Sequence, residues 1–262
     1  MAKKVAEQLV DTLIEAGVRR IYAVTGDSLN EVNEAVRQNE AMKWIHVRHE
    51  ETGAYAAGAE AQLTGLPGCC AGSSGPGHVH LINGLYDAHR SGAPVIAIAS
   101  TIPTGEFGTE YFQETNTVKL FNDCSFYNEV ATTPEQFPRM LQSALQTATT
   151  RKGVAVVGLP GDLAKKPAVK VESSEQIYPL ASSVCPAEED LIRLAGMLNH
   201  YERITLFCGI GCKGAHEEII RMSETLNAPV AYTFKGKMEV QYDNPYEVGM
   251  TGLLGMPSGY YS

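Results

Sequence analysis

A short apolar strand runs directly into a helix of small residues in the stretch Trp44-Ile45-His46-Val47-Arg48-His49-Glu50-Glu51-Thr52-Gly53-Ala54-Tyr55-Ala56-Ala57-Gly58-Ala59-Glu60-Ala61. Its first four residues predict a buried strand, and Gly65 supplies a stop signal for the helix. Small side chains recur at positions 54, 57, 58 and 61 on one helical face, so a bulky group can approach the backbone there. Glu50 lies in the first turn of this helix. A carboxylate there is often only solvated and favoured by the helix dipole, so the neighbouring segments decide its role.

Three further loops follow predicted strands in the same way. Thr25-Gly26-Asp27-Ser28 follows the strand at 20–24, Ser73-Ser74-Gly75-Pro76-Gly77-His78 follows the strand at 68–71, and Tyr111-Phe112-Gln113-Glu114-Thr115 follows the strand at 94–99. Open parallel sheets bind their ligands at the carboxyl ends of the strands. We therefore expect all four loops, with Glu50 among them, to meet at one edge of a sheet.

Short apolar strands alternate with amphipathic helices along the chain, which predicts an α/β fold: a doubly wound parallel sheet with helices on both faces. Helices are expected over 5–16, after Ser28, from about 49, from about 78 and over 134–149, with Ser28 and Glu31 forming a capping box. This first domain covers residues 1–164. Residues 165–186 are rich in Ser and Pro without an apolar period, which predicts a linker, and residues 187–262 predict an incomplete second α/β domain.

The second domain contains a glycine motif between a predicted strand at 204–207 and a helix. Gly209, Gly211 and Gly214 fit G-x-G-x-x-G, which is typical of a phosphate-binding turn but also of a tight turn without a ligand. The next strand, at 229–232, lacks the acidic residue that would hold an adenosine ribose. A nicotinamide cofactor is therefore disfavoured.

Composition excludes several classes of function. The net charge of −9 with interspersed charges argues against nucleic-acid binding, and no apolar run approaches the length of a membrane span, so a cytoplasmic protein is expected. The six cysteines form no C-x-x-C pair, which predicts reduced thiols. His78 and His80 are two residues apart, the wrong spacing for a helical metal pair, and no metal site is predicted. His46 and His49 are interpreted as a surface residue and a helix cap.

In order and spacing, the four loops resemble the pyrimidine-binding domain of thiamine diphosphate enzymes, most closely the pyruvate oxidase and pyruvate:quinone dehydrogenase family. The resemblance rests on Gly75-Pro76-Gly77, on Asn83-Gly84-Leu85-Tyr86-Asp87-Ala88 and on Tyr111-Phe112-Gln113-Glu114. Residues 243–246 and 249–255 resemble the flavin domain of the same family.

The resemblance implies a role for each group of residues. Glu50 would be the catalytic carboxyl that hydrogen-bonds N1′ of the aminopyrimidine, with Ser74, Gly75, Pro76 and Gly77 backing the ring. The substrate pocket would be formed by Phe112 and Gln113, facing Gly26, Asp27 and Ser28. The FAD contacts would be Gly209, Gly211, Thr251, Gly252, Leu253 and Leu254.

The resemblance also implies an activity for a longer parent enzyme: oxidative decarboxylation of pyruvate with thiamine diphosphate, Mg²⁺ and FAD, the electrons passing to quinone or oxygen. The parent would be a homotetramer, associating through the pyrimidine-domain edge and binding peripherally to the inner membrane face. The Gly-Asp-Gly loop that holds Mg²⁺ and the diphosphate in relatives is absent here, so we expect this stretch to be a truncated or proteolytic piece that holds neither cofactor tightly and is inactive alone. The alternatives are an acetolactate synthase-like carboligase or non-oxidative 2-oxo acid decarboxylase, and a non-catalytic binding or assembly module.

Overall fold

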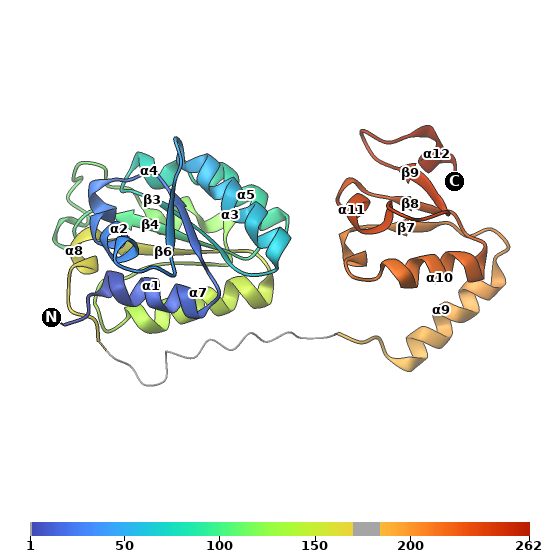
Figure 1. The fold of residues 1–262 in the computed structure, drawn as a ribbon, viewed down its shortest axis with the longest axis horizontal. Coiled ribbons are helices and arrows are strands. Elements are labelled where there is room, and N and C mark those ends of the chain that lie inside the picture. Colours follow the sequence, from blue (N-terminus) through green and yellow to red (C-terminus); the bar gives the residue numbers. More distant parts are fainter. Residues whose placement is uncertain (1, 170–183) are drawn as a thin grey trace. The chain divides into compact units, whose positions relative to one another are not determined.

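The computed structural model describes residues 2–169 and 184–262, so most of the predicted linker at 165–186 lies outside the described residues. The described chain forms two compact units, one on each side of that gap (Figure 1). Every helix in these two ranges is too short or too polar to cross a bilayer.

The first unit is built on a six-stranded sheet with the order β2-β1-β3-β4-β6-β5, in which every neighbouring pair is parallel. The strands are β1 (Arg20–Ala23), β2 (Lys43–His46), β3 (Gly68–Gly72), β4 (Val95–Thr101), β5 (Tyr127–Val130) and β6 (Val154–Pro160). The predicted doubly wound parallel sheet is confirmed. Sequence analysis did not predict β5, because this edge strand is only half buried and has no apolar run.

Helices cover both faces of this sheet (Figure 1). They are α1 (Val5–Glu15), α2 (Asn30–Arg37), α3 (Glu50–Thr64), α4 (Pro76–Val79), α5 (Ile82–Arg90), α6 (Thr117–Leu120), α7 (Phe137–Arg151) and α8 (Gly161–Ala164). The apolar side chains of α1, α2 and α7 pack in one core cluster, and those of α3 and α5 in another. Alternate strand residues divide between the clusters, with Ile96 in the first and Ala97 in the second. This explains why residues 95–99 of β4 are all apolar.

The small-residue face of α3 is occupied within the first unit. A Cβ added to Gly84 of α5 would lie 2.6 Å from the Cβ of Ala54, and one added to Gly58 would lie 3.1 Å from the Cβ of Ala88. A Cβ on Gly68 of β3 would lie 2.1 Å from the carbonyl oxygen of Ala57. The groups that approach the α3 backbone are therefore α5 and β3 of the same chain.

The predicted capping box between Ser28 and Glu31 is wrong. A short 3-10 turn, Asp27–Leu29, precedes α2, and the N-cap Leu29 makes no side-chain cap. Ser28 Oγ instead accepts a hydrogen bond from the backbone N–H of Ser74 at 3.0 Å, and Glu31 accepts one from Lys4 Nζ at 2.8 Å. The long-range partners compete successfully with the local motif.

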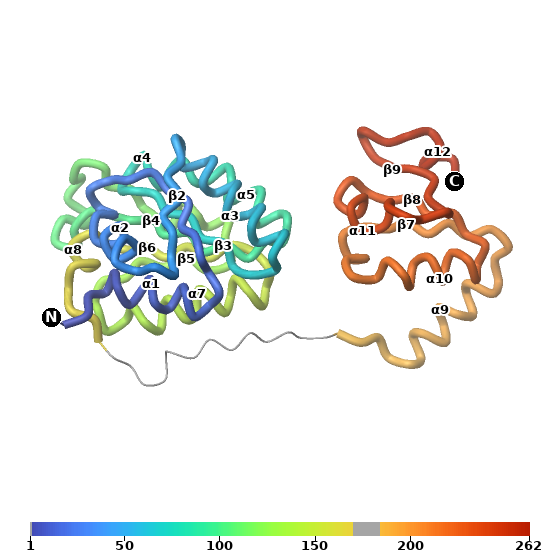
Figure 2. Tube along the Cα trace, in the orientation of Figure 1, coloured from blue at the N-terminus to red at the C-terminus, as the bar shows by residue number. Residues whose placement is uncertain are grey.

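The last described residues of the first unit lie beside its amino-terminal segment (Figure 2). The backbone N–H of Val5 donates to Lys166 O at 3.0 Å, and that of Ala168 donates to Lys3 O at 2.8 Å. Lys4 and Pro167 form an antiparallel bridge.

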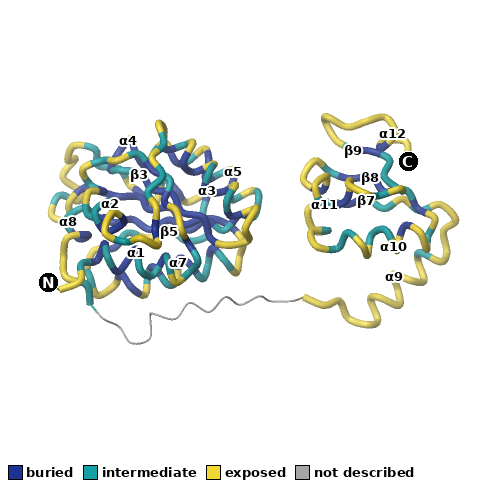
Figure 3. The backbone as a smooth tube through the Cα atoms, viewed as in Figure 1, coloured by how far each residue is buried: buried dark blue, intermediate teal, exposed yellow. Residues whose placement is uncertain are grey.

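The second unit is a small parallel sheet with the order β7-β8-β9. Its elements are α9 (Glu188–His200), β7 (Leu206–Cys208), α10 (His216–Leu226), β8 (Val230–Tyr232), α11 (Lys237–Val240), β9 (Glu247–Met250) and α12 (Pro257–Tyr261). Its buried hydrophobic cluster holds Cys208, Val230, Tyr232 and Val240, whereas α9 buries no residue (Figure 3).

Candidate functional site

Glu50 is a buried carboxyl in the first turn of α3, with 9% of its surface exposed. Its Oε2 lies 3.0 Å from Nδ1 of His80, in the turn between α4 and α5. His80 itself is exposed over 44% of its side chain, so it lies between the buried carboxyl and solvent. His49, the N-cap of α3, accepts a hydrogen bond from the backbone N–H of Glu51 at its Nδ1, as the cap interpretation predicts, and its ring stacks on that of His80 with 4.4 Å between centroids.

A chain of hydrogen bonds joins the loops after β1, β3 and β4. Ser28 Oγ accepts from the backbone N–H of Ser74 at 3.0 Å and lies 3.2 Å from Ser73 Oγ. Ser74 Oγ in turn donates to Gln113 Oε1 at 3.0 Å. Ser100 Oγ, near the end of β4, donates to Ser28 O at 2.8 Å. Three of the predicted site segments thus form one connected cluster, as expected for loops at the carboxyl edge of a parallel sheet.

Glycines bring the backbones of these loops close together. Gly75 has φ +66°, a conformation that favours glycine, and a Cβ there would lie 2.7 Å from the Cβ of Gln113. A Cβ on Gly26 would lie 2.4 Å from Ser73 Oγ, and a Cβ on Gly77 would lie 3.4 Å from Glu50 Oε1. The bare backbone of Gly77 therefore adjoins the Glu50 carboxyl. Asp27, also predicted in this site, is exposed, and its Oδ1 accepts from the backbone N–H of Ser28 at 2.8 Å.

His78 is buried behind the same loop. Its Nδ1 lies 2.8 Å from Ser100 O and its Nε2 lies 2.5 Å from Thr115 Oγ1. A carbonyl can only accept, so Nδ1 carries the proton and Nε2 accepts from the threonine hydroxyl. Burial lowers the pKa of His78, which favours the neutral form of the imidazole. His78 therefore positions the loop after β4 rather than exchanging protons with solvent.

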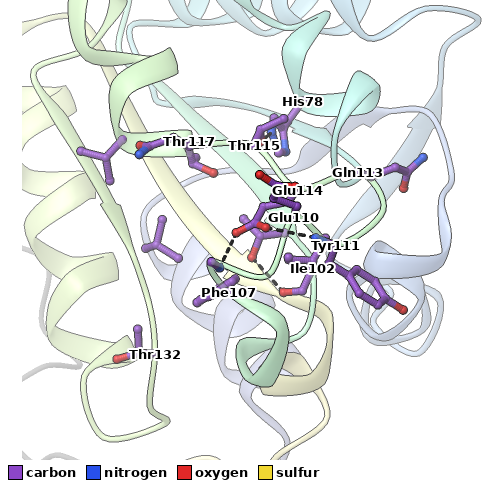
Figure 4. A pocket seen from close by; sticks show the side chains of 15 residues that line it. His78, Ile102, Phe107, Glu110, Tyr111, Gln113, Glu114, Thr115, Thr117 and Thr132 are labelled. Carbon is purple, nitrogen blue, oxygen red and sulfur yellow. Dashed lines mark hydrogen bonds between the residues drawn. The ribbon is translucent and has the colours of Figure 1, made fainter.

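A cavity of about 690 Å³ lies under the loop after β4 (Figure 4). Gln113, Thr115 and His78 line it, together with Ile102 and Phe107, whereas Glu50 does not. The carboxylate of Glu114 accepts from the backbone N–H groups of Gly108 at 2.6 Å and Tyr111 at 3.2 Å, which closes the loop on itself.

Of the two pocket residues predicted after β4, one lines the cavity and the other does not. Gln113 lines the cavity, with φ +65°, and is held by Ser74. Phe112 is 79% exposed and is not part of the cavity wall. Pro76 is exposed as the first residue of α4.

Sequence analysis missed the pairing of His80 with Glu50. In the sequence, His80 stands out only beside His78, at a spacing that excludes a helical metal pair. The two partners are 30 residues apart, and only the packing of the turn after α4 against the start of α3 brings them together. No local pattern could have indicated this contact.

In the second unit, the predicted flavin residues also lie at the carboxyl ends of strands. Gly209 follows β7, and Thr251 to Leu254 follow β9. The backbone N–H of Thr233 donates to Cys208 O at 2.9 Å and that of Thr251 donates to Tyr232 O at 2.8 Å, so successive loops are joined. Leu253 is fully exposed and Leu254 is 73% exposed. Gly211 lies within a 3-10 turn, Ile210–Cys212, and α10 begins two residues after Gly214.

The fold and the edge cluster define the first unit as an open parallel α/β domain with a buried carboxyl among the loops at the carboxyl edge of its sheet. The chain belongs to the thiamine pyrophosphate enzymes: residues 3–120 match the thiamine pyrophosphate enzyme N-terminal TPP binding domain, and residues 191–262 match the central domain of these enzymes. Thiamine pyrophosphate and thiamine diphosphate are the same compound.

Individual relatives differ in their stated activity. The chain is 50% identical over 260 residues to an uncharacterized 42.6 kDa protein in isoamylase 3′region of Pseudomonas amyloderamosa, covering 99% of this chain and 66% of that protein. It is 36% identical to pyruvate oxidase of Lactiplantibacillus plantarum, over 84% of this chain and 37% of the relative. It is 29% identical to the chloroplastic acetolactate synthase of Arabidopsis thaliana, over 99% of this chain and 39% of the relative. The chain therefore spans only part of the length of each of these relatives.

Proposed function

We infer that this chain supplies the pyrimidine-binding and central regions of a thiamine diphosphate enzyme that decarboxylates pyruvate oxidatively, with FAD taking up the electrons. The observation that carries the inference is the buried Glu50 carboxyl beside His80 and the backbone of Gly77. Family membership supports the cofactor, and the pyruvate oxidase relative supports the substrate.

The site fits the aminopyrimidine half of the cofactor. Glu50 offers a carboxyl shielded from water, and the backbone of Gly77 leaves room beside Glu50 Oε1 that a Cβ would fill. Ser74, Gly75, Pro76 and Gly77 would back the ring, while Glu50 would hold a proton at the ring nitrogen. A carboxyl in such surroundings can share a proton with a ring nitrogen because little water competes for it.

Thiamine diphosphate, when bound, would supply a nucleophilic thiazolium carbon for a 2-oxo acid and a ring that takes up the electron pair left behind when CO₂ departs. The residues of this chain would orient the cofactor and the substrate and would hold a proton at the pyrimidine ring. Glu50 holds the proton at the pyrimidine, His80 fixes the Glu50 carboxyl through Oε2, and Gln113, held by Ser74, would contact the substrate from the loop after β4. Gly26, Asp27 and Ser28 would form the facing loop.

The second unit would contribute to the flavin site. Gly209, Gly211 and the exposed segment from Thr251 to Leu254 follow parallel strands at the edge where such sheets bind ligands. The remaining flavin contacts, Mg²⁺ and the diphosphate would be held by parts of the whole protein outside this chain. In a homotetramer, the edge that carries Glu50 would face another subunit.

Glu50→Gln in the whole protein tests the proposal. A glutamine keeps the size of the side chain but cannot share the proton, so we expect hydrogen-deuterium exchange at C2 of bound thiamine diphosphate to slow by about 100-fold or more. Pyruvate-dependent dye reduction should fall with it. The matched control is Glu40→Gln, an exposed carboxylate in the turn after α2, which should leave both rates unchanged.

Three product measurements separate the candidate reactions. Acetate and CO₂ with dye reduction support oxidative decarboxylation, whereas acetolactate formation without dye reduction would assign the chain to the carboligases. Acetaldehyde and CO₂ without dye reduction would indicate non-oxidative decarboxylation. Unchanged C2 exchange in Glu50→Gln would refute the role of Glu50. A whole protein that binds no thiamine diphosphate would instead indicate a non-catalytic module.

A further inference from the structure

Three potential metal ligands converge at the mouth of the Glu50 site. One ring nitrogen each of His49 and His80 and one carboxylate oxygen of Glu50 all lie within 4.8 Å of one another. They come from two different parts of the chain, the start of α3 and the turn after α4. His80 Nδ1 and Glu50 Oε2 are already 3.0 Å apart. Two ligands of one tetrahedral zinc ion, with bonds of about 2.0 to 2.2 Å, lie about 3.3 to 3.6 Å apart, so these two atoms need to separate by only a few tenths of an ångström.

We propose that His49, Glu50 and His80 form a binding site for a divalent transition metal such as Zn²⁺. A set of two imidazoles and one carboxylate binds zinc in preference to magnesium or calcium, which favour oxygen ligands. A water molecule would complete the tetrahedron. This is a different set from His78 and His80, because His78 is buried and both its ring nitrogens are engaged.

The surroundings allow the three ligands to close on an ion. His49 and His80 have 48% and 44% of their side chains exposed, so both rings can turn while the buried Glu50 stays in place. Nδ1 of His49 faces the backbone N–H of Glu51 at 3.3 Å and Glu51 Oε2 at 3.8 Å, which leaves Nε2 for the metal. Ligation through Nε2 places the ring proton on Nδ1, so the cap hydrogen bond from Glu51 N–H would be exchanged for one donated to the Glu51 carboxylate, an arrangement that commonly orients metal-bound histidines.

Three electrostatic effects act on a cation at this site, one unfavourable and two favourable. The positive end of the α3 dipole disfavours a cation at this position. The carboxylates of Glu50 and Glu51 lie at the same helix end and offset that effect. The net charge of −9 further favours a cation over an anion at this surface.

Metal binding and cofactor activation exclude each other, a consequence that rests on the proposed function. An ion bound to Glu50 and His80 occupies the carboxylate that would otherwise hold the proton at the pyrimidine. Zn²⁺ would therefore inhibit the enzyme at its amino-terminal half, independently of the Mg²⁺ site for the diphosphate.

Titration calorimetry of this chain with ZnCl₂, in buffer without chelators or thiamine diphosphate, tests the site directly. We expect one equivalent to bind, with Co²⁺ giving the visible spectrum of a tetrahedral site. His80→Ala, His49→Ala and Glu50→Gln should each weaken binding by about 100-fold or more, and Glu51→Gln by about tenfold. His46→Ala removes an exposed histidine of β2 and should leave binding unchanged.

Two outcomes would overturn the proposal: no binding by the wild-type chain, or equal affinity in wild type, His49→Ala and His80→Ala. Fluorescence of Trp44 and circular dichroism identify any variant that fails to fold. For such a variant, protection of the His80 ring from diethyl pyrocarbonate by Zn²⁺ in the wild-type chain gives a second measurement, and lack of protection would refute the site. Because these experiments contain no thiamine diphosphate, their failure is distinguishable from an unchanged C2 exchange in Glu50→Gln.

Discussion

The two units use the same kind of apolar parallel strand but cover it to very different extents. In the first unit, six strands lie between two helical layers, and β4 and β6 are buried at every residue. In the second unit, three strands of three or four residues support a buried cluster of four side chains. Four large apolar side chains of α9 remain exposed: Leu191, Ile192, Leu194 and Met197. An apolar strand pattern therefore predicts the sheet, but stability depends on what covers its faces.

This difference predicts that the first unit carries most of the stability of the chain. Two probes can measure the units separately. Trp44, the sole tryptophan of the chain, packs against a core cluster of the first unit. Cys208 is buried in the second unit, where burial raises the pKa of its thiol to about 12 and makes it unreactive until that unit opens.

Of the variants that test this difference between the units, Phe137→Ala should change the free energy of unfolding most. The ring is fully buried at the start of α7, and its removal leaves a cavity in a core that cannot collapse onto it. We expect the free energy of unfolding of the first unit to fall by about 4 kcal/mol, measured by Trp44 fluorescence in urea. Phe234→Ala removes an equal side chain that is 71% exposed, and it should change the free energy of unfolding of the second unit, measured by labelling of Cys208 in urea, by less than about 0.5 kcal/mol. Equal losses in the two variants would contradict the contrast in burial.

Gly68→Ala should cause the next largest loss of stability. Its Cβ would lie 2.1 Å from the carbonyl oxygen of Ala57, so β3 and α3 must separate, and we expect a loss of about 3 kcal/mol. Gly105→Ala is the matched control, because no atom lies within 4 Å of its Cβ and its φ is not positive. Thermal unfolding followed at Trp44 distinguishes them. If Gly68→Ala were as stable as the control, the close packing of α3 on the sheet would be wrong.

The sequence predicts the parts of this molecule that depend on local pattern. The apolar runs predicted the parallel sheet of the first unit, and the stop at Gly65 and the cap at His49 are observed. The pairing of His80 with Glu50 is not local, since it depends on how the turn after α4 packs against α3. The capping box at Ser28 failed for a related reason, because a distant backbone N–H at Ser74 binds the same hydroxyl. Long-range contacts are the part that a single sequence does not reveal.

Acid should destabilise the first unit before the second. Burial lowers the pKa of His78 below its ordinary value of 6.5, so the unfolded state takes up a proton at a higher pH than the folded state does. Stability is therefore full above pH 6.5 and is lost as the pH falls through the lower folded pKa. His78→Gln should flatten this dependence in urea unfolding followed at Trp44, whereas the exposed control His46→Gln should keep it. The second unit has only exposed or half-buried histidines among its described residues, and labelling of Cys208 should not shift over this range. A pH slope that survives in His78→Gln would assign the effect to another group.

The smallest expected effect on stability is for substitutions in α9, which test directly whether this helix contributes to the core of the second unit. Ile192 and Leu194 are 65% and 48% exposed, and no residue of this helix is buried. Replacing both with glutamine keeps helix propensity nearly constant and removes only exposed apolar surface. We expect the urea concentration at which Cys208 becomes reactive to be unchanged, corresponding to less than about 0.5 kcal/mol. Peptide mass mapping after thiol labelling measures this without interference from the first unit. A loss above about 1 kcal/mol would mean that the apolar face of α9 is covered in solution, and the weak core of the second unit would then be larger than its buried cluster of four side chains.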